Sequence, residues 1–75
     1  MQTSRSDEII SDGLERISET ARFLGVSRSH VYRLIQEGVL PSVKIGKSRR
    51  VPVRAVRELV LKNMDFVSET ETKQP

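Results

Sequence analysis

Apolar residues recur at helical spacing in the first third of the chain. Ile17, Ala21 and Leu24 lie at i, i+4 and i+7, which is one face of a helix. The start of this helix has two interpretations: Ser18 caps it, or it begins at Ile17 with Glu19 in its first turn. In both cases the spacing predicts a short helix that ends by Leu24, because the glycine that follows favours a helix C-terminus.

A second helix is predicted after a very short connection. Ser27 is a good N-cap residue, and Val31, Leu34 and Ile35 mark one buried face. Only residues 25–27, with the sequence GVS, separate this helix from the first one. Two helices joined by a three-residue turn that contains glycine are typical of a helix-turn-helix.

Beyond Pro41 the apolar spacing changes from that of a helix to that of a strand. Residues 42–46 and 49–52 alternate apolar and polar positions, and the sequence GKS lies between them. This pattern predicts a β-hairpin with its turn at Gly46-Lys47-Ser48. Pro52 has no backbone N–H, so we expect it at the end or on the edge of its strand.

A third helix and two flanking segments complete the prediction. The helix runs from Arg54 to Asn63, and an extension through Met64 and Val67 is left open. The fold class is mainly α with a small β-hairpin (α+β), a winged helix-turn-helix of three helices and a two-stranded wing. The expected ranges are 1–13 for a flexible arm with at most a turn of helix, 14–67 for the domain, and 68–75 for a disordered acidic tail. The candidate core residues are Ile17, Ala21, Leu24, Val26, Val31, Leu34, Ile35, Leu40, Val43, Ile45, Val51, Val56, Leu59 and Val60.

Length and composition limit what this chain can do. Its 75 residues suffice for one domain, and at this size a fold buries only about 60% of the surface that the unfolded chain exposes. There is no cysteine and only one histidine, His30, so we expect neither disulfides nor a metal or cofactor. No apolar run approaches a membrane span or a signal peptide, so a cytoplasmic, nucleoid-associated protein is expected.

Positive charge is concentrated in the middle of the chain. The whole chain carries +3, but residues 14–63 hold eleven Lys/Arg against four acids, a net charge of +7, whereas each flank sums to −2. A domain this basic between acidic flanks indicates a polyanionic partner. Double-stranded DNA is the partner that a helix-turn-helix would take.

The candidate DNA contacts fall on two of the predicted elements. The second helix presents its polar side opposite the apolar stripe, and the hairpin carries four cations within seven residues without an intervening acid. Arg can pair bidentately with guanine, and basic side chains at a hairpin tip can reach phosphates or a narrow minor groove. On the second helix the candidates are Ser27, Arg28, Ser29, His30, Tyr32 and Arg33. On the hairpin they are Lys44, Lys47, Ser48, Arg49 and Arg50, and Arg54 and Arg57 are weaker candidates for backbone contacts.

Two patterns resemble parts of enzyme motifs but lack the other residues that those motifs require. Gly46-Lys47-Ser48 matches the end of a phosphate-binding P-loop, but that motif needs glycine where Pro41 stands and a helix directly afterwards. His30 has no Ser/Asp or carboxylate pair placed to form a catalytic set with it. We therefore expect no enzymatic activity.

The chain resembles the excisionase-family helix-turn-helix proteins, which are related to MerR-type winged helices. The resemblance rests on LGVSRS, VYRLI, the GVLP after the second helix, and the hairpin IG…RVP, and it covers roughly residues 14–62. It implies a recognition helix in the major groove and a wing in the adjacent minor groove. At matched positions, the helix contacts would be Arg28, Ser29, Tyr32 and Arg33, and the wing tip would be Lys47, Ser48, Arg49 and Arg50.

Two positions depart from this family. Arg16 stands where the first helix usually has a Thr or Ser cap, which predicts a late start or a frayed first turn. Arg49 stands where the wing usually has an aromatic residue, which predicts a looser and more basic wing.

The family contains proteins of several roles. Some resemble excisionases, which bend DNA and direct recombination by a tyrosine or serine integrase, and others resemble small transcriptional regulators or autorepressing antitoxins. An excisionase is the leading interpretation, acting as a monomer or as an oligomer assembled on DNA. A different class is a protein-interaction module, in which Met64, Phe66 and Val67 dock onto a partner; those residues could equally pack the third helix onto the domain.

Overall fold

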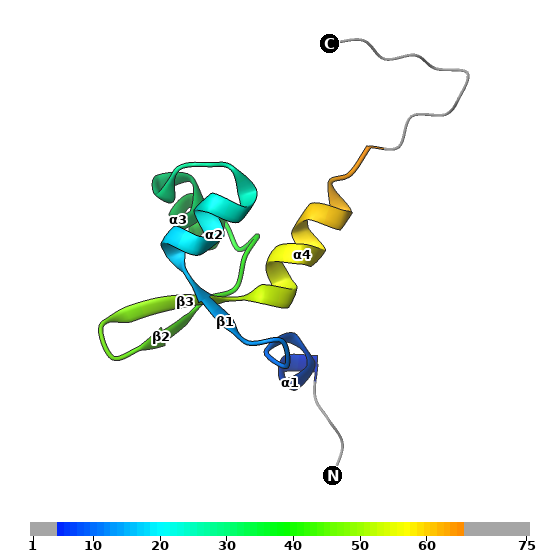
Figure 1. Cartoon of the computed structure of the whole chain (residues 1–75). Coiled ribbons are helices and arrows are strands. Elements are labelled where there is room, and N and C mark those ends of the chain that lie inside the picture. Colours follow the sequence, from blue (N-terminus) through cyan, green and yellow to red (C-terminus); the bar gives the residue numbers. More distant parts are fainter. Residues whose placement is uncertain (1–4, 66–75) are drawn as a thin grey trace, which may run out of the picture.

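A small antiparallel sheet packs against the helix-turn-helix and a C-terminal helix, and the first helix of the helix-turn-helix also contacts that C-terminal helix (Figure 1). This computed structural model describes residues 5–65. The α+β winged helix-turn-helix class is confirmed. The described range adds a third strand that we did not predict, and a five-residue helix in the arm for which a turn of helix was left open. The elements in chain order are α1 (Arg5–Ile9), β1 (Leu14–Arg16), α2 (Ile17–Leu24), α3 (Arg28–Gln36), β2 (Val43–Ile45), β3 (Ser48–Pro52) and α4 (Val53–Lys62).

Helix α2 begins at Ile17, so the interpretation with Glu19 in the first turn is confirmed and the Ser18 cap is wrong. The predicted late start is also wrong. The backbone N–H of Arg16 donates to Glu19 Oε1 at 2.7 Å. The carboxylate at the third helical position therefore stabilises the N-terminus of the helix. The Arg16 side chain makes no capping hydrogen bond, because a guanidinium has no acceptor to offer.

The turn between α2 and α3 uses the two residues that the sequence indicated. Gly25 has φ of +73°, the left-handed conformation that ends a helix at low steric cost. Ser27 Oγ accepts a hydrogen bond from the backbone N–H of His30 at 3.1 Å and caps α3. The predicted end of α2 at Leu24 and the predicted start of α3 after Ser27 are confirmed.

The sheet has the order β1-β3-β2, with β3 in the centre and antiparallel to both neighbours. Ile45 pairs with Ser48, so Ser48 belongs to β3 and the turn is only the two residues 46–47, one fewer than predicted. Gly46 has φ of +63°, as two-residue hairpin turns require. Pro52 is the last residue of β3, which confirms its place at a strand end.

Strand β1 pairs along the second half of β3, with Leu14 opposite Pro52. No pattern in the sequence predicted this strand, because three residues that lead directly into a helix show no alternation of their own. The chain before β1 folds against α4. The N–H of Val53 donates to the carbonyl oxygen of Gly13 at 3.0 Å, and α1 lies close to α4.

The core sits where the sheet meets α2, α3 and α4. Predicted residues that pack there or against it include Val31, Val51 and Leu40. Two predictions are wrong: Ile45 is 56% exposed and Val60 is 38% exposed. Ile45 is the last residue of β2, next to the hairpin turn, and Val60 is rotated away from the inner stripe of α4. The fully or nearly buried residues of the core cluster are Ile17, Ala21, Val31, Leu40, Val51, Ala55 and Val56.

One buried polar side chain, Thr20, was not expected. It is fully buried, and its hydroxyl oxygen lies 3.0 Å from Glu15 Oε2 and 3.1 Å from the carbonyl oxygen of Arg16. The hydroxyl can donate to either acceptor, so its burial leaves no polar atom unsatisfied. This contact ties the first turn of α2 to β1.

Helix α4 ends at Lys62 rather than extending through Met64. The side-chain amide of Asn63 donates to the carbonyl oxygen of Leu59 at 2.8 Å and closes the last turn. Val67 and the predicted tail 68–75 lie outside the described residues. Among residues 5–65, no helix combines the length and the apolar character needed to cross a bilayer.

Leu40→Ala should lower the free energy of unfolding by about 2–5 kcal/mol, because Leu40 is only 2% exposed and its removal leaves a cavity. Leu61→Ala is the matched control: Leu61 is 65% exposed, and its loss should cost about 0.5 kcal/mol or less. Urea denaturation followed by circular dichroism measures both. Equal costs for the two variants would contradict the core described above.

Candidate nucleic-acid interface

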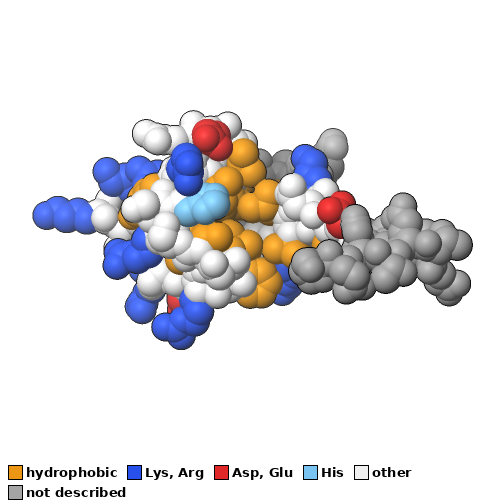
Figure 2. Space-filling model, turned by 90° about the horizontal axis from the view of Figure 1, so that it is seen from above, with side chains coloured by type: hydrophobic (Ala, Val, Ile, Leu, Met, Phe, Trp, Pro, Cys, Tyr) orange, Lys and Arg blue, Asp and Glu red, His pale blue; other side chains and the backbone are white. Residues whose placement is uncertain are grey.

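Helix α3 directs its polar side to solvent. Val31 is completely buried, whereas Arg28, Ser29 and Arg33 are exposed and Tyr32 is 44% exposed. Figure 2 shows Lys and Arg side chains over the wing end of the molecule and on one side of the single histidine, His30, which is half-buried. The exposed side of α3 therefore belongs to a surface dominated by positive charge.

An open hollow of about 410 Å³ lies between the start of α2, the start of α3 and the wing, which we define as β2, β3 and their turn. Five of its nine lining residues are Lys or Arg and none is an acid. Within the described range, none of the five cations forms an ion pair with a carboxylate. We call this site the basic hollow. Its lining residues are Arg16, Ile17, Ser18, Arg28, Tyr32, Lys47, Ser48, Arg49 and Arg50.

The register of the sheet places two pairs of like charges directly opposite one another, and both members of one pair, Arg16 and Arg50, line the basic hollow. Arg16 of β1 is directly opposite Arg50 of β3, and Lys44 of β2 is directly opposite Arg49. Like charges directly opposite one another in a sheet are destabilising. An anion seated between the side chains would remove that cost.

Each of the two arginines of β3 donates a hydrogen bond from its guanidinium. Arg49 Nη1 donates to Ser42 Oγ at 2.9 Å, and Arg50 Nη1 donates to the carbonyl oxygen of Arg49 at 3.4 Å. Both partners are neutral, so the positive charge of each guanidinium stays available to an incoming anion. Lys47, in the turn itself, is exposed.

The weaker candidates of the sequence lie elsewhere. Arg57 Nη1 forms an ion pair with Asp12 Oδ2 at 3.1 Å. Arg54 Nε lies 3.6 Å from Glu58 Oε2, and its Nη1 donates to the carbonyl oxygen of Glu8 at 3.2 Å. These two guanidiniums hold the N-terminal segment against α4 and do not line the basic hollow.

Six of the predicted site residues line the basic hollow. The other predicted residues of α3 and the wing lie outside its lining. Ser27, Ser29, His30 and Arg33 lie on or next to α3, and Lys44 lies on β2, outside the lining. The six that line the hollow are Arg28, Tyr32, Lys47, Ser48, Arg49 and Arg50. Arg16 and Ser18 line the hollow but were not among the predicted site residues. A basic residue at the N-cap position of α2, where a cap is normally short and polar, was the available signal for Arg16.

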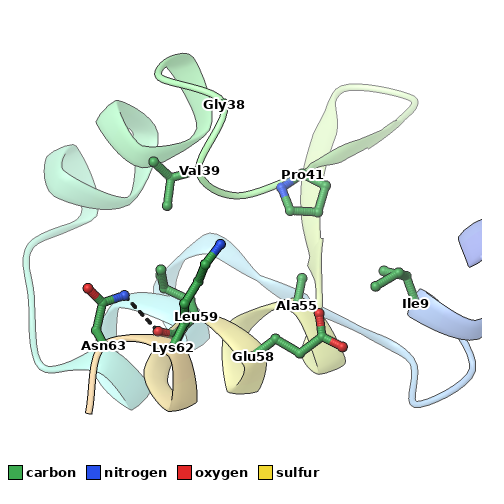
Figure 3. A pocket seen from close by; sticks show the side chains of 9 residues that line it. All are labelled: Ile9, Gly38, Val39, Pro41, Ala55, Glu58, Leu59, Lys62 and Asn63. Carbon is green, nitrogen blue, oxygen red and sulfur yellow. Dashed lines mark hydrogen bonds between the residues drawn. The ribbon is translucent and has the colours of Figure 1, made fainter. Parts of the chain in front are cut away.

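A second, larger groove of about 710 Å³ runs between α4, α1 and the loop after α3. Figure 3 shows Val39 and Pro41 above the side chains of α4, with Ile9 at one end. Its charged groups are one carboxylate, Glu58, and one ammonium, Lys62. In the described part of the chain, no three His, Cys, Asp or Glu side chains come together as a metal site. The lining of this groove is mixed: Ile9, Val39 and Leu59 are apolar, and Glu58, Lys62 and Asn63 are polar.

The family model described as "Helix-turn-helix domain" matches residues 16–64, which include α2, the turn, α3, the wing and α4. The chain belongs to this family. Its similarity to excisionase-type members, inferred above from the motifs, is confirmed by curated relatives.

The relatives carry names of two kinds. A Mycobacterium tuberculosis protein named "Putative DNA-binding protein" is 41% identical over 44 residues, which are 59% of this chain and 56% of that protein. A protein of Saccharopolyspora erythraea named "Probable excisionase" is 40% identical over 53% of this chain and 41% of its own length. A Streptomyces ambofaciens protein named "Excisionase" is 41% identical over 68% of this chain and 82% of its own length. The match thus spans about half the length of the first of these relatives. No solved structure matches the chain.

Arg50→Gln should raise the free energy of unfolding at low ionic strength by about 0.2–1 kcal/mol, because it removes a like-charge pair with Arg16. The gain should fade in 1 M salt, where the Debye length falls to about 3 Å. Lys62→Gln is the control: Lys62 lies in the last turn of α4, where positive charge is favourable, so its loss should not stabilise. Urea titrations at two salt concentrations measure the effect. A gain at Arg50 that is independent of salt would speak against repulsion.

Proposed function

We propose that this chain is a non-catalytic protein that binds double-stranded DNA sequence-specifically. It places α3 in a major groove and the wing in the adjacent minor groove. One observation supports this above the others. Five cations from three separate elements line one hollow without an acid among them. A duplex is a polyanion whose phosphates are regularly spaced, so it can neutralise several such cations at once.

Helix α3 supplies the readout of base edges. The first residues of a recognition helix are the ones that meet the bases, and Arg28 occupies the first helical position of α3. A guanidinium there can pair bidentately with guanine. The other contacts we propose on this element are Ser27, Ser29, His30, Tyr32 and Arg33.

The wing supplies contacts that depend on charge and groove shape. Lys47 lies at the tip and Arg49 and Arg50 behind it, so the ribbon presents cations along its length. A narrow minor groove has enhanced negative potential, which favours inserted basic side chains. Lys44 and Ser48 complete the proposed wing contacts.

Within this class we propose an excisionase that binds and bends DNA and directs recombination together with a tyrosine or serine integrase. The names of two relatives support this role. Such a protein is expected to bind several adjacent repeats cooperatively, as a monomer in solution or as an oligomer on DNA. A small transcriptional regulator, including an autorepressing antitoxin, would instead occupy an operator next to its own gene.

Footprinting and bend-angle measurements on the DNA that flanks the gene distinguish the two roles. Adjacent protected repeats, a large bend and a changed direction of integrase-catalysed recombination support the excisionase. One protected operator that overlaps a promoter, without an effect on recombination, supports the regulator.

Arg28→Ala should weaken binding to the specific site by about 1–3 kcal/mol and relax specificity at one base pair. Lys47→Ala should weaken all duplexes alike and reduce the slope of log K against log[salt] by about 0.9. Fluorescence anisotropy on the specific site and on a scrambled duplex, over a series of salt concentrations, measures both effects.

Lys62→Ala is the matched control for loss of one positive charge, because Lys62 lines the groove of Figure 3 and not the basic hollow. Its salt slope should equal that of the wild type. Wild-type binding that hardly changes with salt would refute the proposal, and wild-type affinity in both Arg28→Ala and Lys47→Ala would refute the assigned face.

A further inference from the structure

We infer that Ser42 is a positioning residue of the DNA interface: its hydroxyl holds the guanidinium of Arg49 in the basic hollow, in the orientation in which the wing meets the duplex. The inference rests on the proposed function and deepens its wing contact. Ser42 is uncharged, lies outside the lining of the hollow and was not among the predicted site residues.

Arg49 is the cation of the hollow that is tied to another segment of the chain. Its Nη1 donates to Ser42 Oγ at 2.9 Å, the usual length of a good N–H···O hydrogen bond. Arg49 is half-buried, whereas Lys47 in the turn is exposed. Within residues 5–65 the other cations of the lining have no such tie, since the guanidinium of Arg50 donates only to the carbonyl oxygen of its neighbour in β3.

The chemistry of this hydrogen bond suits a cation that is kept for a ligand. Lys44 is directly opposite Arg49 in the ladder, and their like charges repel. Ser42 offers the guanidinium a neutral acceptor beside this repulsive pair. A guanidinium has several N–H donors, so one bond to a hydroxyl leaves the other donors and the whole positive charge for the duplex.

Ser42 is itself held by the segment that leaves α3. The backbone N–H groups of Val39 and Leu40 both donate to the carbonyl oxygen of Leu34, at 2.9 and 3.1 Å. The side chain of Leu40 is only 2% exposed, so the core anchors this segment. The hydroxyl therefore has a fixed place relative to α3. Through it, Arg49 is fixed relative to the helix that is proposed to read the major groove.

An arginine that is ordered before binding lowers the cost of association. Immobilising a long, flexible side chain at an interface opposes binding, because the side chain loses rotamer freedom. An arginine that already has its bound orientation avoids that part of the cost. Ser42 thus raises the affinity for DNA through Arg49, without a contact of its own.

Ser42→Ala should reduce the affinity for the specific duplex roughly two- to tenfold, because Arg49 then has to be ordered on binding. The slope of log K against log[salt] should equal that of the wild type, because every cation is retained. Ser42→Thr keeps the hydroxyl and should bind as tightly as the wild type. Fluorescence anisotropy over a series of salt concentrations measures these values, at a temperature at which circular dichroism shows every variant to be folded.

Ser11→Ala is the matched control for loss of one serine hydroxyl. Ser11 Oγ donates to the carbonyl oxygen of Glu8 at 2.8 Å, and it lies outside the basic hollow, so this variant should keep the wild-type affinity. Arg49→Met completes a double-mutant cycle. It should weaken binding by itself, and adding Ser42→Ala to it should weaken binding no further.

Wild-type affinity in Ser42→Ala overturns the inference. So does a loss of the same size when Ser42→Ala is added to Arg49→Met, since Ser42 would then act independently of the guanidinium, and so does a Ser42→Thr variant as weak as Ser42→Ala. If the inference fails while Arg28→Ala still weakens binding, only the role of Ser42 is lost. If the wild type itself binds no duplex, the proposed function fails.

Discussion

Strand β3 forms backbone hydrogen bonds along both of its edges, and this double pairing sets the distance between the helix-turn-helix and the wing. Arg50 belongs to both ladders, opposite Val43 of β2 and Arg16 of β1. Strand β1 continues into α2 and β3 into α4 without an intervening residue. The wing therefore cannot pivot relative to α2 unless ladder hydrogen bonds break, and the two cationic elements are held in place before any ligand arrives.

The two arginines that form ion pairs with acids in the described part of the chain, Arg54 and Arg57, lie outside the basic hollow. Asp12 pairs with Arg57, and the carbonyl oxygen of Glu8 accepts from Arg54, so the N-terminal segment is fastened to α4. The cations around the hollow receive only neutral partners, such as Ser42 for Arg49. Charge is thus neutralised where the fold needs support and left uncompensated where a ligand is proposed. The packing of a small core has to offset the repulsion between these cations.

Periodicity and capping residues were enough to predict α2, α3 and the turn between them, because those signals are local. Strand β1 was beyond prediction, since its stability comes from pairing with residues more than thirty positions later in the chain. The same reason explains Arg16: its neighbourhood depends on the register that puts it opposite Arg50. Ile45 was predicted to be buried from alternation alone, which does not show that a strand extends past the core. The DNA contacts of α3 and the wing remain predictions.

The exposure of Ile45 at the outer end of β2 has a consequence for how such a domain can diversify. The outer part of the ribbon stands clear of the core, and its side chains alternate with a period of two. Adding two residues to each strand would lengthen the ribbon while every inner side chain kept its face. Its reach along a groove could therefore change during evolution without any repacking around Val31 and Val51.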